Sequence, residues 1–161
     1  MAESSHVDRT TSKSAGTSAG GRVAELKAAL EGGSRLIILT HDNPDPDALA
    51  SALALFELVG SFDSLVVQIG FGGIVGRAEN RTMVKVLNLP VTPARDLNFG
   101  DGDLVALVDT QPGTGNNSLP TGWDPAIVID HHPLRLETKR ARYADVRPGF
   151  GTTCTIMMEY L

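Results

Sequence analysis

The sequence predicts an α/β protein with a doubly wound, mostly parallel sheet and helices on both faces. Two observations lead to this prediction. Short apolar runs rich in branched residues alternate along the chain with longer segments of helical periodicity, an alternation typical of parallel strands joined by right-handed crossovers. The apolar runs are also continuous, which indicates strands that are covered on both faces.

The predicted elements follow one another along the chain. Val23, Leu26 and Leu30 recur at helical spacing and predict a first helix that ends near Gly32 and Gly33. The later elements are strands at 35–40, 64–70, 104–109 and 126–130 and helices at 48–59 and 77–89.

Composition sets the broad class of the protein. Of 161 residues, 42% are hydrophobic and 20% are charged, as in ordinary globular domains. Ser, Thr, Gly and Ala dominate the start of the chain, so we expect a disordered leader over 1–20 and a folded domain over 21–161. The sequence has no apolar run of eighteen residues, no signal-peptide core and one cysteine, Cys154, which together favour a cytoplasmic protein that does not enter the membrane.

Acidic and imidazole side chains follow three of the predicted strands. They are His41, Asp45 and Asp47 in the segment HDNPDPD after 35–40, Asp109 at the end of 104–109, and Asp130, His131 and His132 at the end of 126–130. Ligands of parallel sheets bind beyond the carboxyl ends of the strands. Any one of these aspartates taken alone is more often a turn residue or a helix N-cap, so the prediction of a site depends on their convergence.

Convergence of four carboxylates requires a cation or bound protons. Two unit charges about 4 Å apart repel by about 4 kcal/mol at an effective dielectric constant of about 20. Two imidazoles complete a mixed oxygen and nitrogen ligand set, which suits Mn²⁺ and would also accept Co²⁺, Zn²⁺ or Mg²⁺. These side chains outnumber the ligands of one ion, whereas two ions that share a bridging aspartate would use them all. The sequence therefore predicts a site for two divalent ions.

Three motifs resemble, in order and spacing, those of the DHH phosphoesterases. They are HDNPDPDA, VALVD and VIDHHP, and the segment GFGTTCTI at 149–156 is similar to the small-residue segment that follows them in the family. The resemblance covers about residues 34–161. It implies hydrolysis of phosphoesters by metal-activated water, with short oligonucleotides or small nucleotides such as pAp as substrates and pyrophosphate or polyphosphate as alternatives. The net charge of −5 gives no broad basic surface for long duplex DNA.

The resemblance also implies a ligand set for each metal. His41, Asp45 and Asp109 would hold one ion. Asp47, Asp109 and His131 would hold the other, so that Asp109 bridges the two.

Three further residues receive supporting roles. The resemblance implies that Asp130 orients a ligand or binds from behind it, and that His132 contacts the phosphate or protonates the leaving oxygen. Asn43 is expected to fix the first loop by hydrogen bonding.

A glycine-rich segment, GFGGIVGRAENR at 70–81, allows two interpretations. It could cradle a phosphate at a helix start, with Arg77 and Arg81 as substrate-binding cations. Alternatively, Arg77, Glu79 and Arg81 form a solvated, ion-paired helix start. The glycines do not match the pattern GxGxxG, so a Rossmann-type dinucleotide site is not expected.

The resemblance further implies that a metal-binding aspartate and a C-terminal substrate domain lie downstream, whereas this sequence stops at Leu161. We therefore expect an N-terminal fragment of the family's enzyme that turns over weakly by itself. The alternative to an enzyme is a nucleotide- or metal-binding module without turnover.

Overall fold

The computed structural model describes residues 18–62 and 65–161. Its strands are β1 (Arg35–Leu39), β2 (Val66–Phe71), β3 (Val91–Pro93), β4 (Asp103–Val108), β5 (Ile127–Asp130) and β6 (Tyr143–Val146). Its α-helices are α1 (Ala19–Ala29), α2 (Pro46–Gly60), α3 (Ala78–Val86) and α4 (Thr153–Met157), and its 3₁₀ helices are η1 (Ala94–Asp96) and η2 (Leu136–Arg140). Most of the predicted leader lies outside the described residues, and α1 begins two residues before the predicted domain start.

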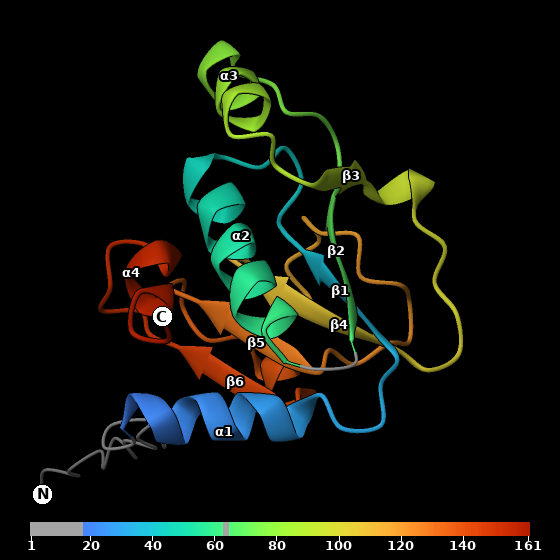
Figure 1. Ribbon diagram of the computed structural model, residues 1–161, viewed down its shortest axis with the longest axis vertical. Helices are drawn as coiled ribbons and strands as arrows, with labels where there is room; N and C mark the ends of the chain where they lie inside the picture. The colour runs from blue at the N-terminus through green and yellow to red at the C-terminus, as the bar shows by residue number, and fades with distance from the viewer. Residues whose placement is uncertain (1–17, 63–64) are drawn as a thin grey trace, which may run out of the picture.

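One parallel sheet organises the described chain (Figure 1). Its strand order is β3-β2-β1-β4-β5-β6, and every pair of neighbours is parallel. The chain moves outward from β1 to β2 and β3, then returns to the other side of β1 and moves outward through β4, β5 and β6. The prediction of a doubly wound parallel α/β sheet is confirmed, and the order reverses between β1 and β4.

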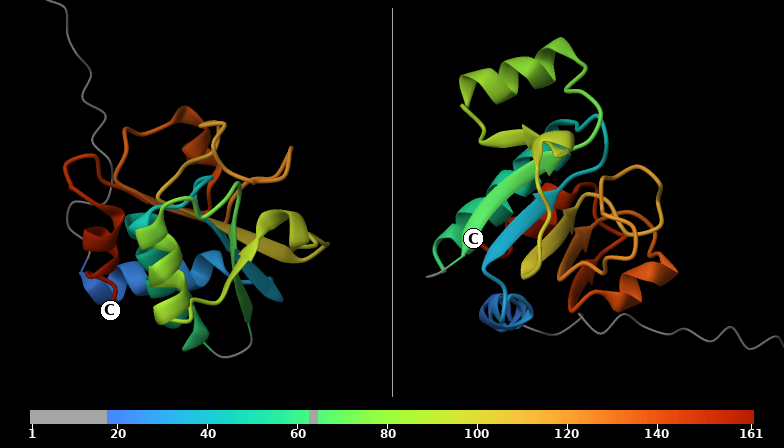
Figure 2. Two further views of the ribbon diagram at one scale, coloured as in Figure 1. Left: turned by 90° about the horizontal axis from the view of Figure 1, so that it is seen from above. Right: turned by 90° about the vertical axis from the view of Figure 1, so that its right-hand side faces the viewer.

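The distribution of helices differs from the prediction of helices on both faces. Helices α1, α2 and α4 contribute to one hydrophobic cluster on a single face of the sheet. Loops and short 3₁₀ helices cover the opposite face, as the right-hand view of Figure 2 shows. Because crossovers are right-handed, the connections from β4 to β5 and from β5 to β6, which run in the opposite direction along the sheet from β1 to β2, lie on the other face. The segments 109–126 and 131–142, which make those later connections, contain no α-helix.

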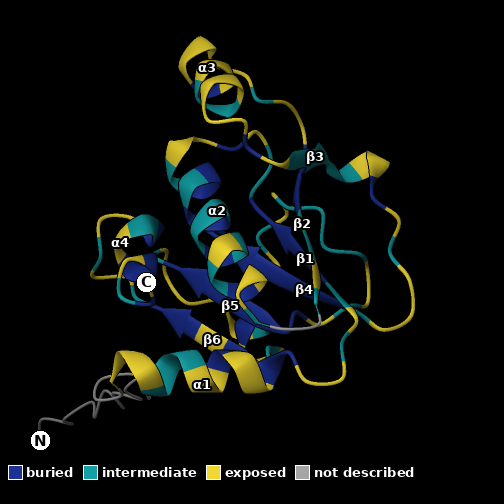
Figure 3. Ribbon diagram, in the orientation of Figure 1, coloured by how far each residue is buried: buried dark blue, intermediate teal, exposed yellow. Residues whose placement is uncertain are grey.

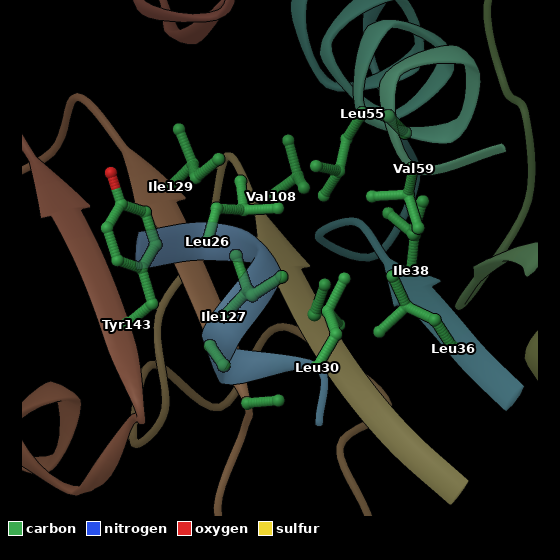
Figure 4. Packing of buried hydrophobic residues seen from close by; sticks show 14 of the residues in the cluster. Leu26, Leu30, Leu36, Ile38, Leu55, Val59, Val108, Ile127, Ile129 and Tyr143 are labelled. Carbon is green, nitrogen blue, oxygen red and sulfur yellow. The ribbon is translucent and has the colours of Figure 1, made fainter. Parts of the chain in front are cut away.

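The helix-covered face holds the larger core. Leu26 of α1, Leu30 at the C-cap of α1, and Leu55 and Val59 of α2 pack over the apolar side chains of the central strands (Figure 4). Those strand residues include Leu36, Ile38, Val108, Ile127 and Ile129. Complete burial of each large aliphatic side chain contributes about 1.5–3 kcal/mol, so this layer supplies much of the stability of the fold.

The other face is closed by the loops. Ile37, Leu107 and Val128 of the strands are completely buried beneath them. Phe99 and Trp123 come from different loops and meet edge to face, with ring centroids 5.8 Å apart. The central strands β1, β4 and β5 are consequently buried on both sides, while α3 stands largely exposed (Figure 3).

A buried polar network joins β6 to the last described residues. The Tyr160 hydroxyl donates to Asp145 over 2.5 Å, and the Arg147 guanidinium donates to both oxygens of the same carboxylate. Burial and the adjacent Asp145 raise the pKa of Tyr160, which keeps its hydroxyl a donor. Arg147 and Arg22 both contact Glu159 over 2.8 Å, so the network also reaches α1.

In the described part of the chain, no helix is long and apolar enough to cross a membrane.

Candidate metal centre

The candidate site lies at the carboxyl edge of the sheet, where its strand order reverses. His41 follows β1, Asp109 follows β4, and Asp130, His131 and His132 come at the end of β5. Because β4 pairs with both β1 and β5, the three loops meet. Ligands of open α/β sheets bind at such a reversal, and the structure brings the predicted side chains together there.

Two imidazoles present the same nitrogen to the centre of the site. His41 Nδ1 lies 2.9 Å from the carbonyl oxygen of Asp42, and His131 Nδ1 lies 3.2 Å from that of Phe150. A carbonyl only accepts, so in the neutral rings the hydrogen belongs on Nδ1 and the lone pair on Nε2. Both Nε2 atoms face Asp109, at 3.6 Å for His41 and 3.5 Å for His131.

Asp109 is the common neighbour of the site's other groups and is itself buried, with 3% of its surface exposed. The Thr153 hydroxyl donates to Asp109 Oδ1 over 2.8 Å. Burial raises the pKa of Asp109 to about 6, with a smaller raising contribution from the charge of Asp47 and an opposing one from the Thr153 hydrogen bond. Its φ of 59° is in the left-handed region, a strained conformation that aspartate tolerates better than most residues and that recurs at functional sites.

Asp45 and Asp47 combine a helix-capping role with proximity to the site. Asp45 is the N-cap of α2, where Oδ1 accepts from the Ala48 amide over 3.0 Å and lies 3.8 Å from His41 Nε2. Asp47 accepts from the amides of Thr153 and Cys154, both over 2.8 Å, and its Oδ2 lies 3.9 Å from His131 Nε2. Asp45 therefore caps α2 and also lies at the candidate site, and its role as a metal ligand stays a prediction.

Asp130 lies behind the histidines. It is fully buried, and its Oδ1 accepts from the His131 amide over 2.9 Å and contacts His132 Nδ1 over 2.8 Å. The hydrogen bond to Asp130 raises the pKa of His132. Asp130 thus holds His132 by Nδ1, which leaves Nε2 of this half-exposed side chain for other contacts.

Gln111 is a buried amide that joins the two loops of the site. Its Nε2 donates to Asp130 Oδ2 over 2.6 Å and to the carbonyl oxygen of Pro133 over 3.1 Å. Its Oε1 accepts from the Arg135 amide and the Thr138 hydroxyl, both over 2.8 Å. Gln111 could not be predicted from the sequence, because a single glutamine in a loop matches no ligand or catalytic pattern.

The arrangement fits divalent cations. Two groups of ligand atoms, each within 4.8 Å of one another, share Asp109: one contains His41 and Asp45, and the other contains His131 and His132. The separations of 3.5–3.9 Å between imidazole nitrogens and carboxylate oxygens are too long for hydrogen bonds. Lone pairs that face carboxylates at this range require a cation or protons between them. Asp47 lies next to the second group, because its Oδ2 is 3.9 Å from His131 Nε2.

A pocket of about 810 Å³ opens over these groups. All seven strand-end residues predicted from the sequence line it: His41, Asp45, Asp47, Asp109, Asp130, His131 and His132. Lining residues that were not predicted are Thr110, Gln111, Thr114, Asn116, Pro133, Leu134, Arg135, Gly151 and Thr152. Pro133 belongs to the motif VIDHHP, and Gly151 and Thr152 belong to GFGTTCTI. The other six lie outside any motif and come together only through the fold.

Arg77 and Arg81 are not among the residues that line the pocket. Arg77 is the N-cap of α3, and Arg81 donates to the carbonyl oxygen of Gly76. Their expected contact with substrate stays a prediction.

The glycine-rich segment supports the first loop of the site. Asn43 Oδ1 accepts from the Ile74 amide over 3.0 Å, as expected of a loop-fixing residue. A side chain at Gly72 would put Cβ 1.7 Å from Asp42 Oδ1, and one at Gly73 would put it 2.4 Å from Asn43 Oδ1. These glycines are therefore explained by close packing against residues 42 and 43.

Fold and site together define an α/β protein with a candidate divalent-metal centre at the reversal of a parallel sheet. Residues 35–161 match the model of the DHH family, N-terminal domain. The chain belongs to the DHH family, whose members are generally phosphoesterases.

Two relatives place the chain among known proteins. It is 38% identical over 127 residues to an uncharacterised protein of Methanocaldococcus jannaschii, a match that covers 78% of this chain and 25% of that protein. The fold is similar to the crystal structure of an exopolyphosphatase-related protein from Bacteroides fragilis, with a TM-score of 0.55 and 14% identity over 88% of this chain and 43% of that one. The chain thus spans about a quarter of the length of the curated relative it matches.

Replacing Gln111 by leucine should destabilise the protein by about 2–4 kcal/mol, because buried partners of the amide, including the Asp130 carboxylate, lose hydrogen bonds. Urea denaturation of the purified variant measures this loss. Gln68→Leu is the control, since Gln68 makes one hydrogen bond of 3.2 Å with Arg35 at a partly exposed site, and it should cost less than about 1 kcal/mol. Equal losses in the two variants would contradict the anchoring role of Gln111.

The raised pKa of Asp109 predicts how the stability of the metal-free protein depends on pH. A carboxyl group with a pKa of about 6 in the folded state and 3.8 ordinarily stabilises the fold in its neutral form. That contribution is complete below the ordinary pKa and is lost as the pH rises through about 6.

The measurement compares wild type with Asp109→Asn, which is neutral at every pH. With EDTA present, the free energy of unfolding of the wild type should fall relative to the variant by on the order of 2 kcal/mol between about pH 4 and about pH 7. A difference between the two proteins that does not change with pH would show that Asp109 titrates normally.

Proposed function

We propose that this chain carries a phosphoesterase site dependent on two divalent ions, which uses water to hydrolyse short oligonucleotides or small phosphorylated nucleotides such as pAp. The observation that supports this most directly is the position of Asp109. It is buried between two imidazoles whose Nε2 atoms face its two oxygens, at 3.6 Å and 3.5 Å. Membership of the DHH family makes phosphoester hydrolysis the chemistry to expect of such a centre.

The first ion would be held by His41, Asp45 and Asp109, and the second by Asp109 and His131 with Asp47 beside them. The mixture of carboxylate and imidazole ligands suits Mn²⁺ best, with Mg²⁺ or Co²⁺ as alternatives. When bound, such ions lower the pKa of water and neutralise charge on phosphoryl oxygens.

The protein's own contribution is to position ligands and to supply a proton. Asp130 holds His132 by Nδ1 and raises its pKa. A protonated His132 can donate from Nε2 to the leaving oxygen or to a phosphoryl oxygen, which is the role of a general acid. The Thr153 hydroxyl keeps Asp109 in place, and the first two amides of α4 do the same for Asp47.

The pocket favours a nucleotide over an extended polyanion. Thr114 and Asn116, which are not buried, line it with a neutral hydroxyl and a neutral amide, groups that suit a sugar or a base better than a row of phosphates. Pyrophosphate and polyphosphate remain the alternative substrates to be tested. The cytoplasmic location favoured by the sequence is part of this proposal.

A binding module without turnover is the second candidate. The observation that favours it is length, because the chain spans a quarter of its curated relative, and groups outside that quarter can complete an active site. In this case the residues of the pocket would bind metal and nucleotide and leave the ester intact.

Mn²⁺ should stabilise the chain against unfolding, because a cation relieves the repulsion among the carboxylates. Mass action gives about 2.7 kcal/mol at one hundred times the dissociation constant. Differential scanning calorimetry with Mn²⁺ and with EDTA measures the gain. Asp109→Asn should remove most of it, whereas Asp124→Asn, at an exposed ion pair with Arg140, should keep it. Identical melting temperatures with Mn²⁺ and EDTA would refute the metal centre.

The Mn²⁺-loaded chain should hydrolyse pAp or short oligoribonucleotides slowly, as measured by product release in a panel that includes p-nitrophenyl phosphate, pyrophosphate and polyphosphate. Asp45→Asn and His131→Ala should each reduce the rate by about 100-fold or more through loss of a ligand. Asparagine is chosen at position 45 because it keeps the N-cap of α2. Metal-loaded, folded protein that binds these ligands without hydrolysing them would support the binding module.

A further inference from the structure

Arg135 is the one lysine or arginine among the residues that line the described pocket. It follows the DHH sequence by three positions and lies on the loop between β5 and η2. The other lining groups are carboxylates, imidazoles, neutral polar groups and a few apolar side chains. A permanent positive charge therefore stands at one place on the pocket wall.

The guanidinium of Arg135 is exposed and takes part in none of the ion pairs found within residues 18–62 and 65–161. Its neighbours in the same part of the chain differ. Arg140 pairs with Asp124 at 3.1 Å, and Arg147 pairs with Asp145 and Glu159. Arg140 and Arg147 are thus paired with acidic side chains, whereas the charge of Arg135 faces the pocket or solvent.

The backbone beneath Arg135 is fixed from inside the protein. The Arg135 amide donates to Gln111 Oε1 over 2.8 Å, and the Thr138 hydroxyl donates to the same atom over 2.8 Å. Gln111 and Thr138 are buried. A long side chain that starts from an ordered backbone loses less conformational freedom when it binds a ligand than one on a mobile loop.

Chemistry restricts what Arg135 can bind. A guanidinium carries no lone pair available for a metal, so Arg135 cannot join the ligand set. Its planar fork of N–H donors matches two oxygens of a phosphate and forms charge-assisted hydrogen bonds with them. The ligand class that fits is therefore an oxyanion with two oxygens on one side.

We propose that Arg135 binds a phosphate group of the substrate in this pocket, and that Gln111 holds it there as a positioning residue. The inference rests on the proposed function and deepens it, because it selects substrates that present a phosphate monoester to the wall formed by residues 133–135. Arg135 is a binding residue in this assignment, and the metal ligands are unaffected by it.

The test uses the full 161-residue chain with Mn²⁺ and takes AMP as the probe, with adenosine as the ligand that lacks phosphate. Calorimetric titration measures the affinity for each ligand, and electron paramagnetic resonance measures the affinity for Mn²⁺. The variants are Arg135→Gln, the conservative Arg135→Lys, and Lys139→Gln. Lys139 is the matched control, since it is exposed on η2 with the same charge and does not line the pocket.

Arg135→Gln should weaken AMP binding by about tenfold or more, Arg135→Lys should recover part of the affinity, and Lys139→Gln should stay within about twofold of wild type. Mn²⁺ affinity should be equal in all four proteins, and adenosine binding should not respond to the substitutions. Unchanged AMP affinity in Arg135→Gln, or an equal loss in Lys139→Gln, would overturn the role of Arg135 while the metal centre stands. Absence of Mn²⁺ binding in the wild type would overturn the proposed function, and this inference with it.

Discussion

Burial of the Asp109 carboxylate beside other carboxylates at the carboxyl edge of the sheet is the constraint on which the rest of this site depends. Asp109 is buried with Asp47 and Asp130 near it, and its raised pKa records the cost of keeping a charge there. Asp109 also has a backbone in the strained left-handed conformation. Strain and crowding of this kind persist only where the surrounding structure holds them in place.

What holds them is a set of hydrogen bonds between segments that are far apart in the sequence. Asp47 on α2 accepts from amides of residues 153 and 154, more than a hundred positions away. Gln111 after β4 fixes the loop that follows β5, and Asn80 of α3 donates to the carbonyl oxygen of Pro44. The loops of the candidate site therefore acquire their shape from contacts between distant segments of the fold.

These contacts between distant segments explain which parts of the fold could be predicted from the sequence and which could not. The central strands were predictable because their apolar runs are continuous, and the seven strand-end residues were predictable because parallel strands gather their carboxyl ends. Strand β3 was missed because it is three residues long and ends in Pro93, and β6 because it contains the charged Asp145. Asp145 is buried by pairing with Arg147 and Tyr160, and no local pattern predicts that pairing.

Gln111 and Arg135 show a second limit of prediction from sequence motifs. Neither belongs to a motif, and each is an ordinary loop residue until the fold brings position 111 beneath position 135. The helices were assigned to both faces for a related reason, since the alternation of strands and helices predicts crossovers without showing which connections lack a helix. The segments 109–126 and 131–142 are such connections, and they cover the second face directly.

This arrangement restricts how the protein can change over evolutionary time. The segments 109–126 and 131–142 line the pocket on one side and shield Leu107 and Val128 from water on the other. An insertion or deletion in either segment that changed ligand preference would also expose the apolar face of the sheet. New specificities in this lineage should therefore arise by single substitutions at the pocket wall, or by fusion to other domains, more readily than by loop exchange.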